Sequence, residues 1–259
     1  MILVDTHTHL YSEQFAEDRS KMIKRAIASN VEKMYLPNVD MSSIEGMLAV
    51  EKEFPENCFA MMGLHPTSVK ADYKSQLKEM EQWLERRDFV AIGEIGIDLY
   101  WDKTFKAAQI DAFKIQIEWA KEKDIPFVIH ARDATAEVIE VLKETHHDKM
   151  RGIFHCFGGS TEEAHQIIEL GFYLGIGGIV TFKNSKLGET LEQVDLKHIV
   201  LETDAPYLTP MPYRGKRNES SYINFVAEKL TEVKKCSLKE IAKITTENAL
   251  NLFEKREKM

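Results

Sequence analysis

Short runs of apolar and β-branched residues recur along the chain, with amphipathic stretches between them. Most of these runs are almost continuously hydrophobic, which is typical of parallel strands that are covered on both faces. The chain contains eight such runs, at Ile2–His9, Lys33–Pro37, Phe59–Leu64, Phe89–Ile95, Pro126–His130, Gly152–Phe157, Phe172–Val180 and His198–Thr203. The pattern therefore predicts eight buried strands.

The stretches between the runs have the periodicity of helices. From Thr104 to Asp124, and again from Asp133 to His146, apolar residues recur on one helical face with charged residues between them. Ser160 and the residues after it offer the hydroxyl and acidic groups that begin helices. A last helix is expected from Ser237 to about Glu254.

Eight strands that alternate with helices, without a linker, fit one domain. Within 259 residues this pattern predicts an α/β fold, a single (β/α)8 TIM-type barrel with an additional C-terminal helix, over residues 1–259. A doubly wound open sheet is the alternative.

Composition limits the class of protein and its partners. A hydrophobic fraction of 44% and a charged fraction of 29% are ordinary for a soluble globular protein. The net charge of -8 means that any nucleic acid must be held by a local basic patch or by bound cations. Without a signal-peptide pattern, a disulfide framework or a run of about 18 apolar residues, we expect a cytoplasmic, membrane-free monomer.

The reactive residues lie where the predicted strands end. In a barrel, the carboxyl ends of the strands converge on one face, where catalytic groups lie. The first run includes Asp5, His7 and His9 at alternate positions, which in a strand would share one face. The ends of later runs carry His65, Glu94, Asp98, His130, His155, Glu202 and Asp204.

Burying this many imidazoles and carboxylates at the end of an apolar barrel costs free energy unless the groups are paired or bind cations. The number of candidate ligands exceeds the three or four protein ligands of one zinc site. It suits two divalent ions about 3.5–4 Å apart that share a carboxylate. The predicted metal ligands are His7, His9, Glu94, His130, His155 and Asp204, with Glu94 as the bridge. Zn, Mn or Mg would serve as the ion.

Three residues of this set have more than one interpretation. His65 contacts substrate, binds a third ion or stabilises the turn before Pro66. Glu202 contacts substrate or supports a ligand. Asp98 either holds a ligand in place or caps the segment that follows it.

Six stretches carry a resemblance to a known family. They read "DTHTHL", "GLHP", "GEIGID", "IHAR", "FHCFGG" and "LETDAPYLTPMPYRGKRNE", between residues 5 and 219. In this order they resemble the TatD-like metal-dependent deoxyribonucleases, within the amidohydrolase-type barrels. The resemblance implies a (β/α)8 fold, hydrolysis of phosphodiester bonds in DNA with divalent metals, and ligand roles for the six residues named above.

The chain departs from the family pattern at two places. Ser220 stands where the family usually has proline, and Gly158 or Gly159 where it often has serine. Many amidohydrolase barrels bridge their metals with a modified lysine on the fourth strand, where this chain has Glu94. That difference argues against amidases that depend on such a lysine.

The expected mechanism is attack by an activated water, with Glu94 and Asp204 as the catalytic residues and Asp204 as proton acceptor. The predicted substrate-binding residues are His65, Arg132, Glu202, Arg214, Lys216 and Arg217, the last three in an acid-free stretch after the eighth run. Nearby aromatic residues such as Trp101 and Tyr207 favour single strands or ends. The alternatives are a two-metal hydrolase of another ester or amide, and a barrel that has lost catalysis.

Overall fold

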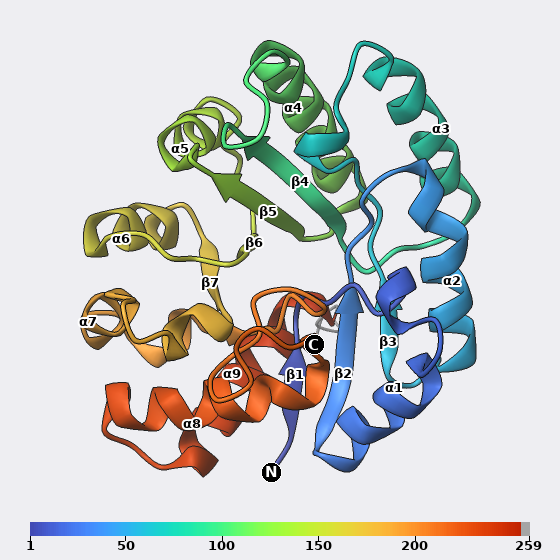
Figure 1. Cartoon of the computed structure of the whole chain (residues 1–259). Coiled ribbons are helices and arrows are strands. Elements are labelled where there is room, and N and C mark those ends of the chain that lie inside the picture. Colours follow the sequence, from blue (N-terminus) through green and yellow to red (C-terminus); the bar gives the residue numbers. More distant parts are fainter. Residues whose placement is uncertain (255–259) are drawn as a thin grey trace, which may run out of the picture.

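The computed structural model describes residues 1–254 as strands that alternate with helices (Figure 1). The eight strands are β1 (Leu3–Asp5), β2 (Val31–Leu36), β3 (Cys58–Ala60), β4 (Ile92–Asp98), β5 (Phe127–Arg132), β6 (Gly152–Phe154), β7 (Phe172–Ile176) and β8 (Ile199–Leu201). The nine α-helices are α1 (Arg19–Ala28), α2 (Ile44–Glu53), α3 (Tyr73–Arg86), α4 (Lys106–Lys123), α5 (Thr135–Glu144), α6 (Thr161–Glu169), α7 (Leu187–Glu192), α8 (Ile223–Lys234) and α9 (Leu238–Phe253). Among residues 1–254, no helix has the length and apolar character needed to cross a membrane.

The strands run parallel and follow one another around a ring. β1–β2–β3 form one ladder and β4 to β8 a second. Backbone hydrogen bonds close both gaps: Thr6 N–H donates to Leu201 O (3.0 Å) beside β1 and β8, and Met62 N–H donates to Ala91 O (3.2 Å) between β3 and β4. A doubly wound sheet would reverse its strand order at a switch point. The fold is therefore the predicted (β/α)8 TIM-type barrel.

Side chains alternate between the inside and the outside of this ring. Val4, Tyr35, Val128, Ile153 and Val200 come from five strands and pack into one buried cluster, which is possible only inside the barrel. Their neighbours along the strands pack outward in a larger cluster with the helices.

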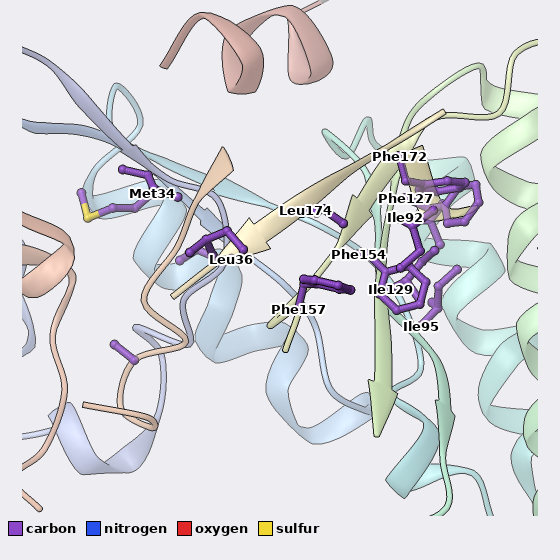
Figure 2. Close-up of a cluster of buried hydrophobic side chains, with 14 of the residues drawn as sticks. Met34, Leu36, Ile92, Ile95, Phe127, Ile129, Phe154, Phe157, Phe172 and Leu174 are labelled. Carbon is purple, nitrogen blue, oxygen red and sulfur yellow. The ribbon is translucent and has the colours of Figure 1, made fainter. Parts of the chain in front are cut away.

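Figure 2 shows part of this outer layer, where large side chains of neighbouring strands meet. The rings of Phe127 and Phe172, from β5 and β7 on either side of Gly152 in β6, also lie edge to face, with centroids 5.1 Å apart. Both side chains are fully buried. Tight packing on the outer face holds the strands in fixed register, so their carboxyl ends present side chains in fixed positions.

The additional C-terminal helix, α9, packs against the barrel. Its Phe253 ring stacks on Tyr35 at 3.9 Å between centroids, and Leu252 joins the same inner cluster. Asn248 donates to the carbonyls of Leu196 and Ile199, just before β8 and at its first residue. The helix thus covers the amino end of the barrel and leaves the carboxyl end accessible.

Candidate metal centre

The inward positions of three strands lead directly to the reactive residues. His130, His155 and Glu202 each lie two positions beyond an inward-facing valine or isoleucine, at Val128, Ile153 and Val200 respectively. Because side chains two apart on a strand share a face, all three point into the carboxyl end of the barrel. Sequence periodicity alone is enough to place them there.

β1 behaves differently from the predicted alternation. Val4 faces inward, so Asp5 faces outward, where its carboxylate accepts from the N–H (2.9 Å) and the hydroxyl (2.6 Å) of Thr203. The strand ends at Asp5, and His7 and His9 turn inward after it. The prediction that all three side chains share one face is therefore wrong for Asp5. Burial raises the pKa of Asp5 to about 7 despite these hydrogen bonds.

One oxygen of Glu94 faces the histidines that follow β1. The separations are His7 Nε2–Glu94 Oε2 3.1 Å, His9 Nε2–Glu94 Oε2 3.8 Å, His9 Nε2–Asp204 Oδ1 3.4 Å and His7 Nε2–Asp204 Oδ1 3.8 Å. Four-coordinate ions with bonds of about 2.1 Å place neighbouring ligand atoms about 3.4 Å apart. His7, His9 and Glu94 therefore have the spacing of ligands around one cation, and Asp204 lies beside both of these histidines.

The other oxygen of Glu94 faces a second set of histidines. The separations from Glu94 Oε1 are 2.9 Å to His130 Nδ1, 3.5 Å to His65 Nε2 and 3.8 Å to His155 Nε2. The Glu94 side chain is 3% exposed, so neither oxygen is solvated in bulk water. A carboxylate placed in this way can be shared by two cations.

A tyrosine not predicted as a site residue orients His9. The Tyr11 hydroxyl lies 2.9 Å from His9 Nδ1 and donates to the carbonyl of Pro37 at 2.6 Å. Because its only hydrogen is used there, Tyr11 must accept a hydrogen from His9 Nδ1. In the neutral ring this leaves the lone pair on His9 Nε2, which faces Glu94 and Asp204. The position of Tyr11, two residues after His9, is the only signal of this role in the sequence.

Carboxylates orient two further histidines. Asp98 Oδ2 lies 2.8 Å from His130 Nε2, and Asp98 Oδ1 accepts the N–H groups of Tyr100 and Trp101. Asp98 therefore has both of the roles between which its sequence position left a choice. It holds a histidine in place and caps the segment after β4.

Glu202 lies beneath His155, and its Oε1 is 3.0 Å from His155 Nδ1 and accepts Cys156 N–H at 2.7 Å. Its side chain is fully buried. Gly175 leaves space for it, since a Cβ at that position would meet Glu202 Oε2 at 2.3 Å. Glu202 thus supports His155 and is not among the residues that line the cavity, and its substrate contact stays a prediction.

The electrostatics of the cluster fit bound cations. Burial would raise the pKa of Glu94, but His7, His65 and His155 together lower it well below its usual value. Burial would lower the pKa of His155, but Glu202 and Glu94 raise it to about 10. Within residues 1–254, both ring nitrogens of His7 are buried without a hydrogen-bond partner. The site therefore attracts positive charge and contains imidazole nitrogens available to bind it.

A cavity of about 760 Å³ opens over the cluster. Its lining includes His9, His65, Glu94, Asp98, His130, Arg132, His155 and Asp204, with Trp101 and Tyr207 at the rim. The Arg132 guanidinium lies 3.9 Å from the centroid of the Tyr100 ring and has no ion pair within residues 1–254. The structure thus brings Arg132 and His65 to the cavity.

The three cations after β8 are not part of the cavity lining. Arg217 forms an ion pair with Asp18 at 2.8 Å and lies over the Phe15 ring, contacts that hold this loop in place, and its substrate contact stays a prediction. Arg214 is exposed and stacks over Phe182 at 4.0 Å. Lys216 is exposed as well. These two remain available only to a substrate that extends beyond the cavity.

A parallel barrel with a buried histidine–carboxylate cluster at its carboxyl end defines the class of metal-dependent hydrolases. A family model described as "TatD related DNase" matches residues 4–254. The "uncharacterized metal-dependent hydrolase YabD" of Bacillus subtilis is 42% identical over 97% of this chain and 99% of its own. YcfH of Escherichia coli, with the same description, is 32% identical over 98% of this chain and 96% of its own.

Solved structures agree with this assignment. The crystal structure of YjjV, a TatD homologue from Escherichia coli, superposes with a TM-score of 0.91 at 29% identity and covers 97% of each chain. The chain belongs to the TatD family of metal-dependent hydrolases.

Proposed function

We propose that this protein is a deoxyribonuclease that hydrolyses phosphodiester bonds with two divalent ions. His7, His9, Glu94 and Asp204 would hold one ion, and Glu94, His130 and His155 the other. The observation that carries the proposal is Glu94, whose two oxygens face separate sets of histidines in a buried site. When bound, the ions supply positive charge that activates water and offsets charge on the phosphoryl oxygens.

The side chains of the site have distinct tasks in this reaction. Asp204 lies in the cavity with 14% of its side chain exposed, so it can orient an attacking water and accept its proton. Tyr11 and Asp98 hold His9 and His130 in fixed orientations. The rigid placement avoids reorganisation during the reaction.

The rim of the cavity supports a nucleic-acid substrate. Arg132, which has no ion pair within residues 1–254, provides a positive charge next to the cluster, and the exposed side chain of Trp101 (68%) provides a flat apolar surface. Stacking of a base on such a surface requires that the base is unpaired. We therefore propose a preference for single strands or ends. The family's description as a DNase-related group agrees with this substrate class.

The test is digestion by metal-stripped protein, to which Zn, Mn or Mg is restored one at a time. Labelled single- and double-stranded DNA and RNA of one sequence serve as substrates, with a carboxyl ester and an amide in parallel. We expect cleavage of DNA only after an ion is restored, faster on single strands. Hydrolysis of the ester or amide with intact DNA would contradict the proposal.

A further inference from the structure

His65 is held by the turn that follows it. The 3-10 helix η3 (Pro66–Ser68) begins directly after His65, which caps its first turn. Pro66 has no N–H, so the first free donor of the turn is Thr67 N–H, which donates to His65 Nδ1 at 3.1 Å. The Thr67 hydroxyl lies 2.7 Å from the same nitrogen.

This contact fixes which ring nitrogen carries the hydrogen. A backbone N–H only donates, so His65 Nδ1 must accept and is unprotonated. An imidazolium would place an N–H group against the N–H of Thr67, which excludes the doubly protonated ring. The hydrogen of His65 is therefore on Nε2.

That nitrogen points into the candidate metal centre. His65 Nε2 lies 3.5 Å from Glu94 Oε1, and its ring packs edge to face against His130 with centroids 4.4 Å apart. The side chain lines the cavity and is 12% exposed. Position alone would group His65 with Glu94 and His130 as a third ligand.

A comparison with His9 separates the two roles. The bond from His9 Nδ1 to Tyr11 leaves Nε2 of the neutral His9 ring with its lone pair toward Glu94, whereas His65 turns an N–H toward the same residue. A metal ligand needs a lone pair directed at the ion. His65 has a donor at that place instead.

We propose, resting on the proposed function, that His65 donates a hydrogen bond from Nε2 to a phosphoryl oxygen of the substrate and is not a metal ligand. The hydrogen stays on Nε2 throughout, so no proton is transferred. A fixed donor aimed at an oxygen that gains charge stabilises the transition state more than the ground state. His65 is thus a catalytic residue of the cavity wall.

Two substitutions separate the functions of the ring. In His65→Asn, the amide oxygen replaces Nδ1 as the acceptor for Thr67 N–H and preserves the cap, but the donor is lost. In His65→Gln, an amide nitrogen reaches toward the Nε2 position and restores a donor. His155→Asn serves as the control in which a proposed ligand is removed.

Three measurements are made on each protein: ions bound per chain by mass spectrometry, affinity for inorganic phosphate with ions present, and hydrolysis of a single-stranded DNA. We expect His65→Asn to bind as many ions as the wild type, while its phosphate affinity falls about 10-fold and its kcat falls about 10²–10³-fold. His65→Gln should recover part of both losses. His155→Asn should bind fewer ions.

Loss of an ion in His65→Asn would show that His65 is a ligand and overturn the proposal. Unchanged phosphate affinity and kcat in that variant would overturn it as well. If the wild type cleaves no DNA, the proposed function fails separately, because ion count and phosphate affinity still decide the role of His65.

Discussion

The two ends of the barrel each contain a cavity, and the two cavities differ in their polar groups. At the amino end, about 900 Å³ lies between the segments that precede β4, β5 and β6 and the end of α9. Several of its charged groups have partners: Arg151 binds Asp124 at 3.0 Å, Glu254 binds Lys33 at 3.1 Å, and Lys123 donates to Leu84 O at 2.7 Å. At the carboxyl end the cavity is smaller, yet His7 Nε2 is buried beside the carboxylates of Glu94 and Asp204 and has no hydrogen bond within residues 1–254.

The difference teaches that the size of a cavity does not identify a functional site. Paired groups at the amino end have no need of a ligand. Imidazoles and carboxylates at the carboxyl end are buried at a cost that bound cations would offset.

Replacing Glu94 by alanine should abolish ion binding and hydrolysis, because both sets of histidines lose their shared carboxylate. We expect kcat/KM to fall by at least about 10⁴-fold, the scale of losing a central catalytic group. Calorimetry with Zn or Mn and a DNA digestion measure the two losses. Asp124→Ala, at the other cavity, is the matched control and should change neither. Retained activity in Glu94→Ala would refute the assignment.

Glu202→Gln should weaken ion binding about 10–100-fold, since a neutral amide holds His155 less firmly than a carboxylate. The fold should persist, because the amide has nearly the shape of the carboxylate. Competition with a coloured chelator measures the affinity. An affinity equal to the wild type would mean that Glu202 serves only packing.

Ions should stabilise the protein. At an ion concentration about 100 times Kd, binding adds about 2.7 kcal/mol to the free energy of unfolding, or roughly 5–10 °C in Tm. Thermal unfolding with and without a chelator measures this shift. Glu94→Ala should show no shift, and an equal shift in that variant would place the ions elsewhere on the protein.

Arg132→Gln should raise KM for DNA about 10-fold. It should also reduce the slope of log binding constant against log salt concentration by about 0.7, because one phosphate contact on a single strand contributes about that much. Arg217→Gln, whose cation is already paired with Asp18, should leave both unchanged. Titrations at several salt concentrations compare the two. Equal effects would mean that the loop after β8 binds substrate as strongly as the cavity rim.

The smallest effect concerns the pair of Asp18 and Arg217 in acid. Arg217 lowers the pKa of Asp18 from 3.8 to about 2, so the pair stabilises the folded state above the unfolded pKa and loses this contribution as pH falls from 3.8 through 2. Asp18→Asn should reduce stability by less than about 1 kcal/mol near neutral pH and flatten its acid dependence in that window. Unfolding curves at several pH values, with chelator present, measure both.

Much of the barrel could be predicted because its strands are buried on both faces and therefore read as apolar runs. Each of the eight runs overlaps a strand, and inward positions placed His130 and His155 at the carboxyl end. The predicted cap at Ser160 is also confirmed, since its side chain accepts Glu163 N–H.

The remainder depends on contacts between distant segments, which local patterns do not encode. Arg217 pairs with Asp18, which lies 199 positions away in the sequence, so the sequence around Arg217 gave no sign of this acidic partner. The Tyr11 hydroxyl forms hydrogen bonds with Pro37 O and His9 Nδ1, and these contacts exist only once the loops have folded together. Asp5 faced outward because the register of β1 is set by Val4 and not by the alternation of polar residues.

The hydrogen bonds that join β1 to the segment after β8 bear on how the enzyme matures in the cell. Asp204 N–H donates to His7 O at 2.9 Å, so residues made near the start and near the end of translation meet at one seam. A nascent chain in which residue 204 has not yet been synthesised lacks this contact, so His7 and His9 have no Asp204 beside them. We therefore expect loading with ions to follow release of the finished polypeptide.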